Sequence, residues 1–220
     1  MSGRVTKTMG GHDVHNPLFA RLYTRLSAKG EARGAAEHRE RLLAGLSGRG
    51  VEVGAGHGLN FSHYPSSVSE VVAVEPEPYL RARAEEAARG VSVAVSVVDG
   101  VADALPLDDG SVDAGVASLV LCTVPDQARA LAELRRVIRS GGELRFYEHV
   151  ASTRPGARGV ERVLDATVWP RVGGGCHLAR DTQAAIERAG FEIASCERFA
   201  FGPGGGPIRI AHILGVARRP

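Results

Sequence analysis

The sequence contains few cysteines, no long apolar run and no large excess of charge of either sign. Its three cysteines, Cys122, Cys176 and Cys196, are far apart and lack Cys-x-x-Cys spacing, which argues against a disulfide framework and favours reduced thiols in a cytoplasmic protein. No apolar stretch reaches the roughly 18 residues that span a bilayer, and the polar segment 1–12 has no signal-peptide core. A formal net charge of +2 gives no strong field, so nucleic acid is not an implied partner.

The length of the chain limits the number of domains. At 220 residues it is long enough for one α/β domain with a small addition, and two full domains are not expected. The pattern predicts an N-terminal tail and helical cap over residues 1–47 and one main domain over residues 48–220.

One short stretch, Val51 to Gly58, combines a buried-strand signal with closely spaced glycines. Glycine accepts the positive φ of a tight turn and lets the backbone approach a ligand, so we interpret this stretch as a nucleotide-cofactor cradle. A dinucleotide fingerprint, Gly-x-Gly-x-x-Gly, requires a third glycine at position 59, where this chain has Leu59. The third glycine is Gly58, which weakens the dinucleotide interpretation.

The remaining pattern alternates between strands and helices. We expect helices over residues 16–28, 31–46, 59–64, 78–89, 125–139, 155–169 and 181–190, and strands ending near 53 and over 70–74, 91–98, 112–117, 143–147, 191–201 and 207–217. The strand 91–98 is nearly all apolar and is expected to be buried on both faces. The last two strands are joined only by residues 202–206, which is too short for a parallel crossover. The sequence therefore predicts an α/β fold, a doubly wound, Rossmann-like, mostly parallel sheet with a C-terminal antiparallel hairpin.

Glu75 follows the strand 70–74 and lies 21 residues after Gly54. An acidic side chain at this distance, at the carboxyl end of the second strand, can accept hydrogen bonds from both ribose hydroxyls of a cofactor. The loop 100–106 is expected to line the adenine pocket. The first two helices are interpreted either as a lid, with Phe19 and Tyr23 facing inward, or as ordinary core packing.

Four runs of residues carry a resemblance to a known family. They are Glu52-Val53-Gly54-Ala55-Gly56-His57-Gly58-Leu59-Asn60-Phe61, Tyr64-Pro65, Ser118-Leu119-Val120-Leu121-Cys122-Thr123-Val124 and Gly175-Cys176-His177-Leu178. With a terminal hairpin and an acid after strand two, the chain resembles the class I S-adenosylmethionine-dependent methyltransferases from about residue 48 to its C-terminus. Within them it is similar to the methyltransferase type 11 branch and to the alkyl-thiol methyltransferase-like proteins. The resemblance implies a seven-stranded sheet.

The resemblance also implies a cofactor site for S-adenosylmethionine. Glu52 is implied to hold the methionine amino group, Glu75 the ribose hydroxyls, and Pro76 to pack on adenine. Ser118 and Leu119 are implied to lie near the methyl-bearing sulfonium. Val101 stands where the family often has an acid, so Asp99, Asp103 or the backbone is left to recognise the adenine amino group. The full expected set is Glu52, Gly54, Ala55, Gly56, Asn60, Glu75, Pro76, Gly100, Val101, Ala102, Ser118 and Leu119.

Methyl transfer from a sulfonium requires alignment of donor and acceptor, and a base when the acceptor is a hydroxyl or thiol. His149 and His177 are the catalytic candidates, with Asp13 and His15 as further possible bases. We expect no metal site, since adjacent Cys176 and His177 side chains rarely point together and no other cluster supplies ligands. Cys122 is expected to pack as a small hydrophobe, and Trp169 and Phe199 to line an acceptor pocket or the core.

The leading hypothesis is a methyltransferase acting on a small, fairly apolar acceptor with a thiol, hydroxyl, amine or activated carbon as target. The alternatives are a nicotinamide-dependent (NAD) oxidoreductase and a non-catalytic cofactor-binding protein. No membrane span is expected, and the oligomeric state stays open.

Overall fold

The computed structural model describes residues 17–167, 169, 174–202 and 209–220. The proposed bases Asp13 and His15 lie outside these residues, as does most of the glycine-rich link before the last strand.

The order of helices and strands follows the predicted alternation. The helical elements are α1 (Pro17–Gly30), a π-helical turn (Glu31–Ala35), α2 (Ala36–Leu43), a 3₁₀ turn (Phe61–His63), α3 (Pro78–Ala88), α4 (Gln127–Val137), α5 (Pro155–Ala166) and α7 (Thr182–Arg188). The strands are β1 (Gly48–Val53), β2 (Val68–Val74), β3 (Ala94–Val98), β4 (Val112–Ser118), β5 (Ile138–His149), β6 (Glu192–Phe201) and β7 (Ile210–Arg218). Side-chain caps begin three helices, from Glu77, Asp126 and Asp181.

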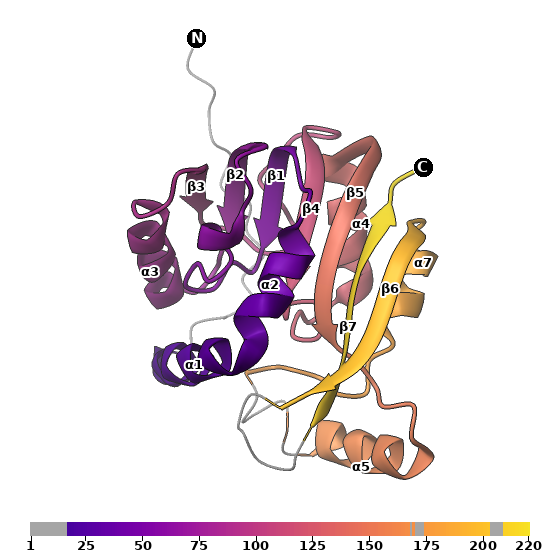
Figure 1. Cartoon of the computed structure of the whole chain (residues 1–220). Helices are drawn as coiled ribbons and strands as arrows, with labels where there is room; N and C mark the ends of the chain where they lie inside the picture. The colour runs from indigo at the N-terminus through magenta and orange to yellow at the C-terminus, as the bar shows by residue number, and fades with distance from the viewer. Residues whose placement is uncertain (1–16, 168, 170–173, 203–208) are drawn as a thin grey trace.

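The strands form one seven-stranded sheet in the order β3-β2-β1-β4-β5-β7-β6 (Figure 1). Strands β1 to β5 pair in parallel, while β7 runs antiparallel to both β5 and β6. The prediction of a doubly wound sheet with a terminal antiparallel hairpin is confirmed. The strand order reverses between β1 and β4, so their carboxyl ends diverge there and leave a crevice for a ligand.

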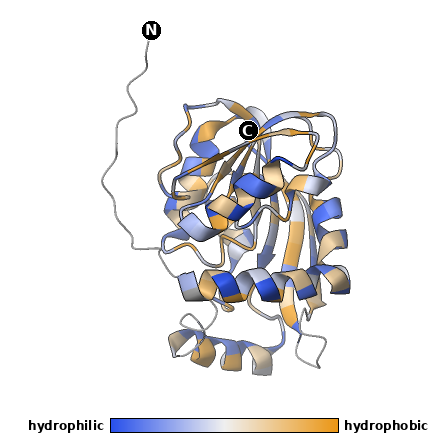
Figure 2. Cartoon of the chain, turned by 90° about the vertical axis from the view of Figure 1, so that its left-hand side faces the viewer, coloured by the Kyte–Doolittle hydropathy of each residue, from blue (hydrophilic) through white to orange (hydrophobic). Residues whose placement is uncertain are grey.

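Alternate residues of the strands build two apolar layers, one on each face of the sheet. Val51, Val53 and Phe146 pack with α4 and α7 on one face, whereas Val71, Ala73 and Tyr147 pack with α2 and α3 on the other. Figure 2 shows hydrophobic residues concentrated in the strands and hydrophilic ones recurring along the helices. This alternation fixes which side chains reach each face, because a shift of one residue would reverse a whole strand.

Two expectations from the sequence were wrong in detail. Strand β3 is an edge strand with no fully buried residue, because it pairs only with β2. The predicted helix at 59–64 is only a 3₁₀ turn, since Pro65 stops it after one turn. On α1, Leu22 and Leu26 are about half exposed and do not form an inward apolar face. The chain bends after α1 at Gly34, whose φ is 115°.

None of the helices in the described part of the chain is long and apolar enough to cross a membrane.

Candidate functional site: a crevice at the carboxyl ends of the strands

The glycine stretch leaves β1 at the point where the strand order reverses. Gly54 and Gly56 have φ values of 61° and 59°, a left-handed conformation that side-chain-bearing residues rarely adopt. Leu119, just after β4, has φ of 57° and is alone in this among the non-glycine residues that the structure describes. Such a strained residue typically marks a functional site, and here it faces the glycine loop across the strand-order reversal.

Glu52 lies beneath this crevice and is almost fully buried. Its carboxylate accepts hydrogen bonds from Asn60 Nδ2 at 2.9 Å and from the Tyr64 hydroxyl at 2.8 Å. Burial raises the pKa of Glu52 to about 7, although both hydrogen bonds oppose the shift. A buried carboxylate that lines a crevice is suited to receive a cationic group from a ligand, which would restore its charge.

Arg39 on α2 lines the same crevice, although it is not among the site residues predicted from the sequence. It is 5% exposed; its Nη1 donates to Asn60 Oδ1 at 2.8 Å and to Ser118 Oγ at 3.1 Å, and its Nε pairs with Glu31 at 2.9 Å. The crevice therefore holds a buried cation and a buried anion joined through Asn60. From the sequence alone, a buried arginine on an amphipathic helix cannot be distinguished from one that is exposed to solvent.

Glu75 closes the other side of the glycine loop. Its two carboxylate oxygens accept hydrogen bonds from the backbone N–H of Gly56 at 2.8 Å and of Glu77 at 2.9 Å. Burial raises the pKa of Glu75 to about 7 against these bonds. The predicted position of Glu75 at the end of the second strand is confirmed, and it lies directly against the loop.

Helix α1 covers the glycine loop. The ring of Tyr23 meets the His57 ring edge-on at 5.8 Å and stacks with Phe19 at 5.9 Å, while Ser27 Oγ lies 3.3 Å from His57 Nε2. The ring of Phe19 also fills the space beside Gly174, where an added Cβ would lie 2.1 Å from it. Phe19 and Tyr23 thus face inward, as the lid interpretation expects. In Figure 1, α1 lies below the sheet, at the lower left.

Two features of the crevice leave a small space and a polar group open to a ligand. A Cβ added at Gly56 would point toward Tyr23, 3.7 Å from its ring, into the space between loop and lid. The buried Nδ1 of His57 has no hydrogen-bond partner within the described residues. The crevice is lined by Tyr23, Arg39, Glu52, Gly54, Ala55, Gly56, His57, Leu59, Asn60 and Ser118.

The remaining predicted cofactor residues lie around this crevice without lining it. Gly100 packs against Val74, where an added Cβ would lie 2.9 Å away, and Val101 pairs with Ala104 in an isolated bridge. Ala102 packs on the apolar layer of α4, and the carboxylate of Asp99 pairs with Arg81 at 3.0 Å. The roles of these residues in cofactor binding stay predictions, as do those of the predicted residues that line the crevice.

A second cluster lies beyond the ends of β4 and β5. His149 Nδ1 is 3.8 Å from Cys122 Sγ and 3.2 Å from Cys176 Sγ, and these three atoms all lie within 4.8 Å of one another. Hydrogen bonding with Cys122, reinforced by His149, lowers the pKa of the Cys176 thiol in spite of its burial. The premise that Cys176 has no neighbouring cluster was wrong, because parallel strands β4 and β5 bring Cys122 and His149 to the same edge.

The side chain of the second histidine candidate has a different partner. His177 Nδ1 lies 3.7 Å from an oxygen of Asp165, and its side chain is 36% exposed. Of the two histidines, His149 is therefore the one that lies among nucleophilic groups.

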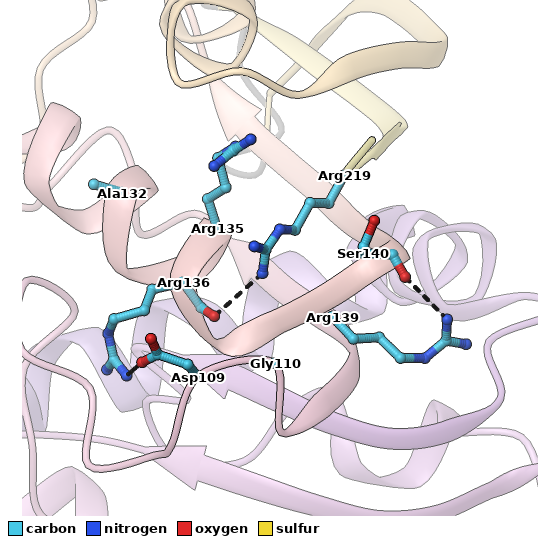
Figure 3. Close-up of a pocket in the computed structure, with 8 residues that line it drawn as sticks. All are labelled: Asp109, Gly110, Ala132, Arg135, Arg136, Arg139, Ser140 and Arg219. Carbon is cyan, nitrogen blue, oxygen red and sulfur yellow. Dashed lines mark hydrogen bonds and ion pairs between the residues drawn. The ribbon is translucent and has the colours of Figure 1, made fainter.

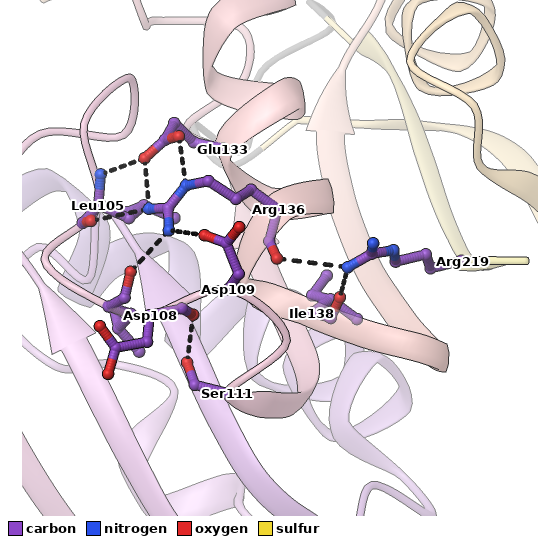
Figure 4. Close-up of polar contacts among 9 residues, drawn as sticks. Leu105, Asp108, Asp109, Ser111, Glu133, Arg136, Ile138 and Arg219 are labelled. Atoms are coloured by element: carbon purple, nitrogen blue, oxygen red, sulfur yellow. Dashed lines mark hydrogen bonds and ion pairs between the residues drawn. The ribbon is translucent and has the colours of Figure 1, made fainter.

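A groove at the opposite, amino-terminal edge of the sheet collects arginines (Figure 3). Arg136 donates to Glu133, to Asp109 and to two backbone carbonyls, and Arg219 donates to the carbonyls of Arg136 and Ile138 (Figure 4). These contacts hold the loop before β4 and the start of β5 together. They give the groove a structural role, distant from the glycine loop.

Comparison with known proteins agrees with this geometry. Residues 51–146 match the family described as Methyltransferase domain. The chain is 36% identical over 163 residues to the thiol S-methyltransferase TMT1B of Homo sapiens, covering 71% of this chain and 66% of that protein, and 38% identical over 157 residues to TMT1A of Homo sapiens, covering 68% and 63%. It thus spans slightly less than two thirds of the length of these relatives.

Solved structures show the same fold. A possible histamine N-methyltransferase of Thermotoga maritima has a TM-score of 0.69 at 24% identity, covering 92% of this chain and 97% of that one. An S-adenosylmethionine-dependent methyltransferase of Mesorhizobium loti has a TM-score of 0.63 at 25% identity, covering 88% and 100%. The glycine loop, its paired acids and these relatives agree, and the chain belongs to the S-adenosylmethionine-dependent methyltransferases.

Proposed function

We propose that this protein transfers a methyl group from S-adenosylmethionine to the thiol of a small, fairly apolar molecule. The observation that carries the proposal is the crevice itself, where a buried anion, Glu52, and a buried cation, Arg39, flank the left-handed glycine loop. The choice of a thiol over a hydroxyl, amine or carbon acceptor is supported by the relatives, which are named thiol S-methyltransferases.

The charges of the crevice complement the zwitterionic end of the cofactor. Glu52 would receive the ammonium group, and Arg39, whose guanidinium has donors left after its bonds to Asn60 and Ser118, would bind the carboxylate. Glu75 already accepts from Gly56 N and keeps lone pairs for the ribose hydroxyls. Pro76 and the loop 100–102 would then flank the adenine. These assignments orient the cofactor with its sulfonium toward Ser118 and Leu119.

When bound, the cofactor supplies an electrophilic methyl carbon whose bond to sulfur breaks with the electron pair going to that sulfur. The protein must hold the acceptor sulfur in line with this carbon and leave it unprotonated. Phe19 and Tyr23 give the lid an apolar, aromatic inner side, which suits an acceptor with little charge. His149, at the end of β5 next to β4, is the candidate group to assist this deprotonation.

The test is a panel of acceptors of matched size, an alkyl thiol, a phenol and an amine, scored for S-adenosylhomocysteine release and for the methylated product by mass spectrometry. We expect product only with the thiol. Phe19→Ala is expected to raise KM for the thiol while Leu22→Ala, a change of an exposed residue on the same helix, leaves KM unchanged. Methylation of the amine or phenol in preference to the thiol would overturn the choice of acceptor.

Cytoplasmic location, inferred from the three cysteines, stays a prediction.

A further inference from the structure

Three side chains with metal-binding atoms meet at one point beyond β4 and β5. Cys122 comes from the loop after β4, His149 from the last residue of β5, and Cys176 from the loop before α7. His149 is 27 residues away from each of the two cysteines in sequence, so the fold alone brings the three together. Two thiols and one imidazole are the donor set that zinc prefers.

The spacing of the donor atoms fits a tetrahedral ion. With Zn–S bonds of about 2.3 Å and Zn–N bonds of about 2.0–2.1 Å, a tetrahedral centre holds sulfur and nitrogen ligands about 3.6 Å apart. The two observed distances from His149 Nδ1, 3.8 Å and 3.2 Å, lie on either side of this value. The nitrogen and the two sulfurs are therefore spaced close to the separations of ligands on one face of a coordination tetrahedron.

The loops that carry the two cysteines are fixed by hydrogen bonds. The buried carboxylate of Glu148 accepts from the backbone N–H of Val120, Leu121 and Cys122 at 3.0, 2.9 and 3.1 Å. His177 N donates to Cys122 O at 2.8 Å, and Arg180 Nη1 donates to Leu121 O and Val124 O at 2.7 and 2.8 Å. Such outer contacts hold ligands in place before a metal binds.

The cluster is also contiguous with the cofactor crevice. Val120, two residues before Cys122, packs so closely on the glycine loop that a Cβ at Gly54 would lie 2.4 Å from its methyl group. Tyr23 on the lid has its pKa raised chiefly by burial, and the charges of both Glu75 and Cys122 raise it further, so the tyrosine lies within electrostatic reach of both sites. Phe19 covers Gly174, two residues before Cys176.

Trp169 is a further neighbour of the cluster. It packs against Cys122, Cys176 and Leu178, and its side chain forms a hydrogen bond with Cys176.

We propose that Cys122, His149 and Cys176 bind a zinc ion whose fourth coordination position takes the sulfur of the acceptor thiol. Catalytic zinc sites keep three protein ligands and one open position, whereas structural sites are closed by four. Two thiolates balance the charge of Zn²⁺, so the site adds no net charge to a buried region. On binding, the acceptor thiol loses its proton to solvent, and the electron pair left on sulfur is the one that forms the new bond to the methyl carbon. The neutral thioether product is a weaker ligand and leaves. This inference rests on the proposed thiol methylation.

The first test measures metal binding alone. The full chain, purified in reductant and stripped with a chelator, is titrated with Zn²⁺ against a chromophoric competitor and separately with Co²⁺ as a spectroscopic probe. We expect one equivalent of metal, the strong visible bands of tetrahedral Co²⁺ and a near-ultraviolet sulfur-to-metal band. Cys122→Ser and Cys176→Ser should each weaken binding by more than the roughly 10–100-fold that loss of an outer contact costs. Cys196→Ser is the matched control, because Cys196 lies on β6 and contacts Gln183 instead.

The second test links the metal to the acceptor. An alkyl thiol added to the Co²⁺-loaded protein should shift the visible bands, while the corresponding alcohol should not. Failure of Cys122→Ser and Cys176→Ser to weaken metal binding relative to Cys196→Ser would overturn the site, as would a Cys122–Cys176 disulfide that persists in reductant. If the metal-free protein methylates thiols at the full rate, the zinc proposal fails and the proposed function stands. If zinc and cofactor both bind but no thiol is methylated, the proposed function fails.

Discussion

The two edges of the sheet carry charge in opposite ways. At the carboxyl edge three buried glutamates, Glu52, Glu75 and Glu148, accept hydrogen bonds from backbone or neutral donors, and burial raises the pKa of each to about 7. At the amino edge the carboxylates face arginines and water, and hydrogen bonding to Arg136 lowers the pKa of Glu133 while bonding to Arg139 lowers that of Asp113.

The larger hollow lies at the amino edge of the sheet, away from the glycine loop. The arginine groove is the larger and more open of the two, yet Arg136 is already paired there with Asp109 and Glu133. The carboxyl edge holds its acids in an electrostatically costly state that a cationic ligand would relieve. Unrelieved charge and backbone strain, rather than size, mark the functional edge.

Two glycines allow the sharpest comparison of the edges. Gly56 and Gly110 both have φ of 59°, and an added Cβ would meet its nearest neighbour at 3.7 and 3.8 Å respectively. Each change to alanine should therefore cost a similar 1–2 kcal/mol or so of stability from backbone strain. Only Gly56→Ala should weaken S-adenosylmethionine binding, by about 100-fold, since its methyl group projects toward the lid and disturbs the N–H that Glu75 accepts.

Thermal denaturation and isothermal titration of both variants check this prediction. Equal losses of cofactor affinity in Gly56→Ala and Gly110→Ala would mean that Gly56 affects cofactor binding only through the stability of the fold.

The raised pKa of Glu52 predicts a pH dependence of cofactor binding. The carboxyl group is half protonated near pH 7 in the free protein, and the cofactor ammonium favours the charged form, so binding expels a proton. The affinity for S-adenosylmethionine should therefore rise between pH 6 and pH 7.5, by about 5- to 10-fold for each carboxyl group that loses its proton on binding. Above pH 7.5 the affinity should level off. Titrations in two buffers of different ionisation enthalpy measure the released proton.

Glu52→Gln is the control for that dependence. This variant should bind S-adenosylmethionine more weakly at pH 7.5, and its affinity should depend less steeply on pH. Part of the pH dependence should remain, because Glu75 still titrates in this range. An unchanged slope would remove Glu52 from contact with the ammonium group.

The smallest effect on cofactor binding is expected at the amino edge. Arg136→Ala removes bonds to Glu133, to Asp109 and to the carbonyls of Leu105 and Leu107, and should lower stability by about 1–2 kcal/mol. Cofactor affinity should stay within about twofold, because no contact of Arg136 reaches the crevice. Urea denaturation paired with isothermal titration separates the two quantities, and a tenfold loss of affinity would show that the edges are coupled.

The sheet was predictable because its signals are local. Apolar runs, the glycines after β1 and the short link before β7 each constrain a few neighbouring residues, and together they define the strand order. The position of Glu75 followed from the same logic, since a strand end points to the carboxyl edge. The 3₁₀ turn and the exposed face of β3 depend on packing partners far along the chain, which the local pattern does not contain.

The charged and sulfur-bearing parts of the site were harder to predict. Arg39 reaches the crevice only because α2 packs on one face of the sheet, and nothing in its own helix indicates this. The cluster of Cys122, His149 and Cys176 left a usable signal, because two of its members follow adjacent parallel strands. Cys176 is adjacent to His177 in sequence, but its partners Cys122 and His149 follow two neighbouring strands of the sheet.

Isothermal titration of S-adenosylmethionine into the wild-type protein and Glu75→Gln tests the central claim most directly. The substitution keeps the side-chain shape and one acceptor for the backbone, so the fold should persist by circular dichroism. We predict saturable one-to-one binding to the wild type and at least a tenfold weaker affinity in Glu75→Gln. Absence of binding to folded wild-type protein, or equal affinity in the variant, would contradict the assignment of the carboxyl edge as the cofactor site.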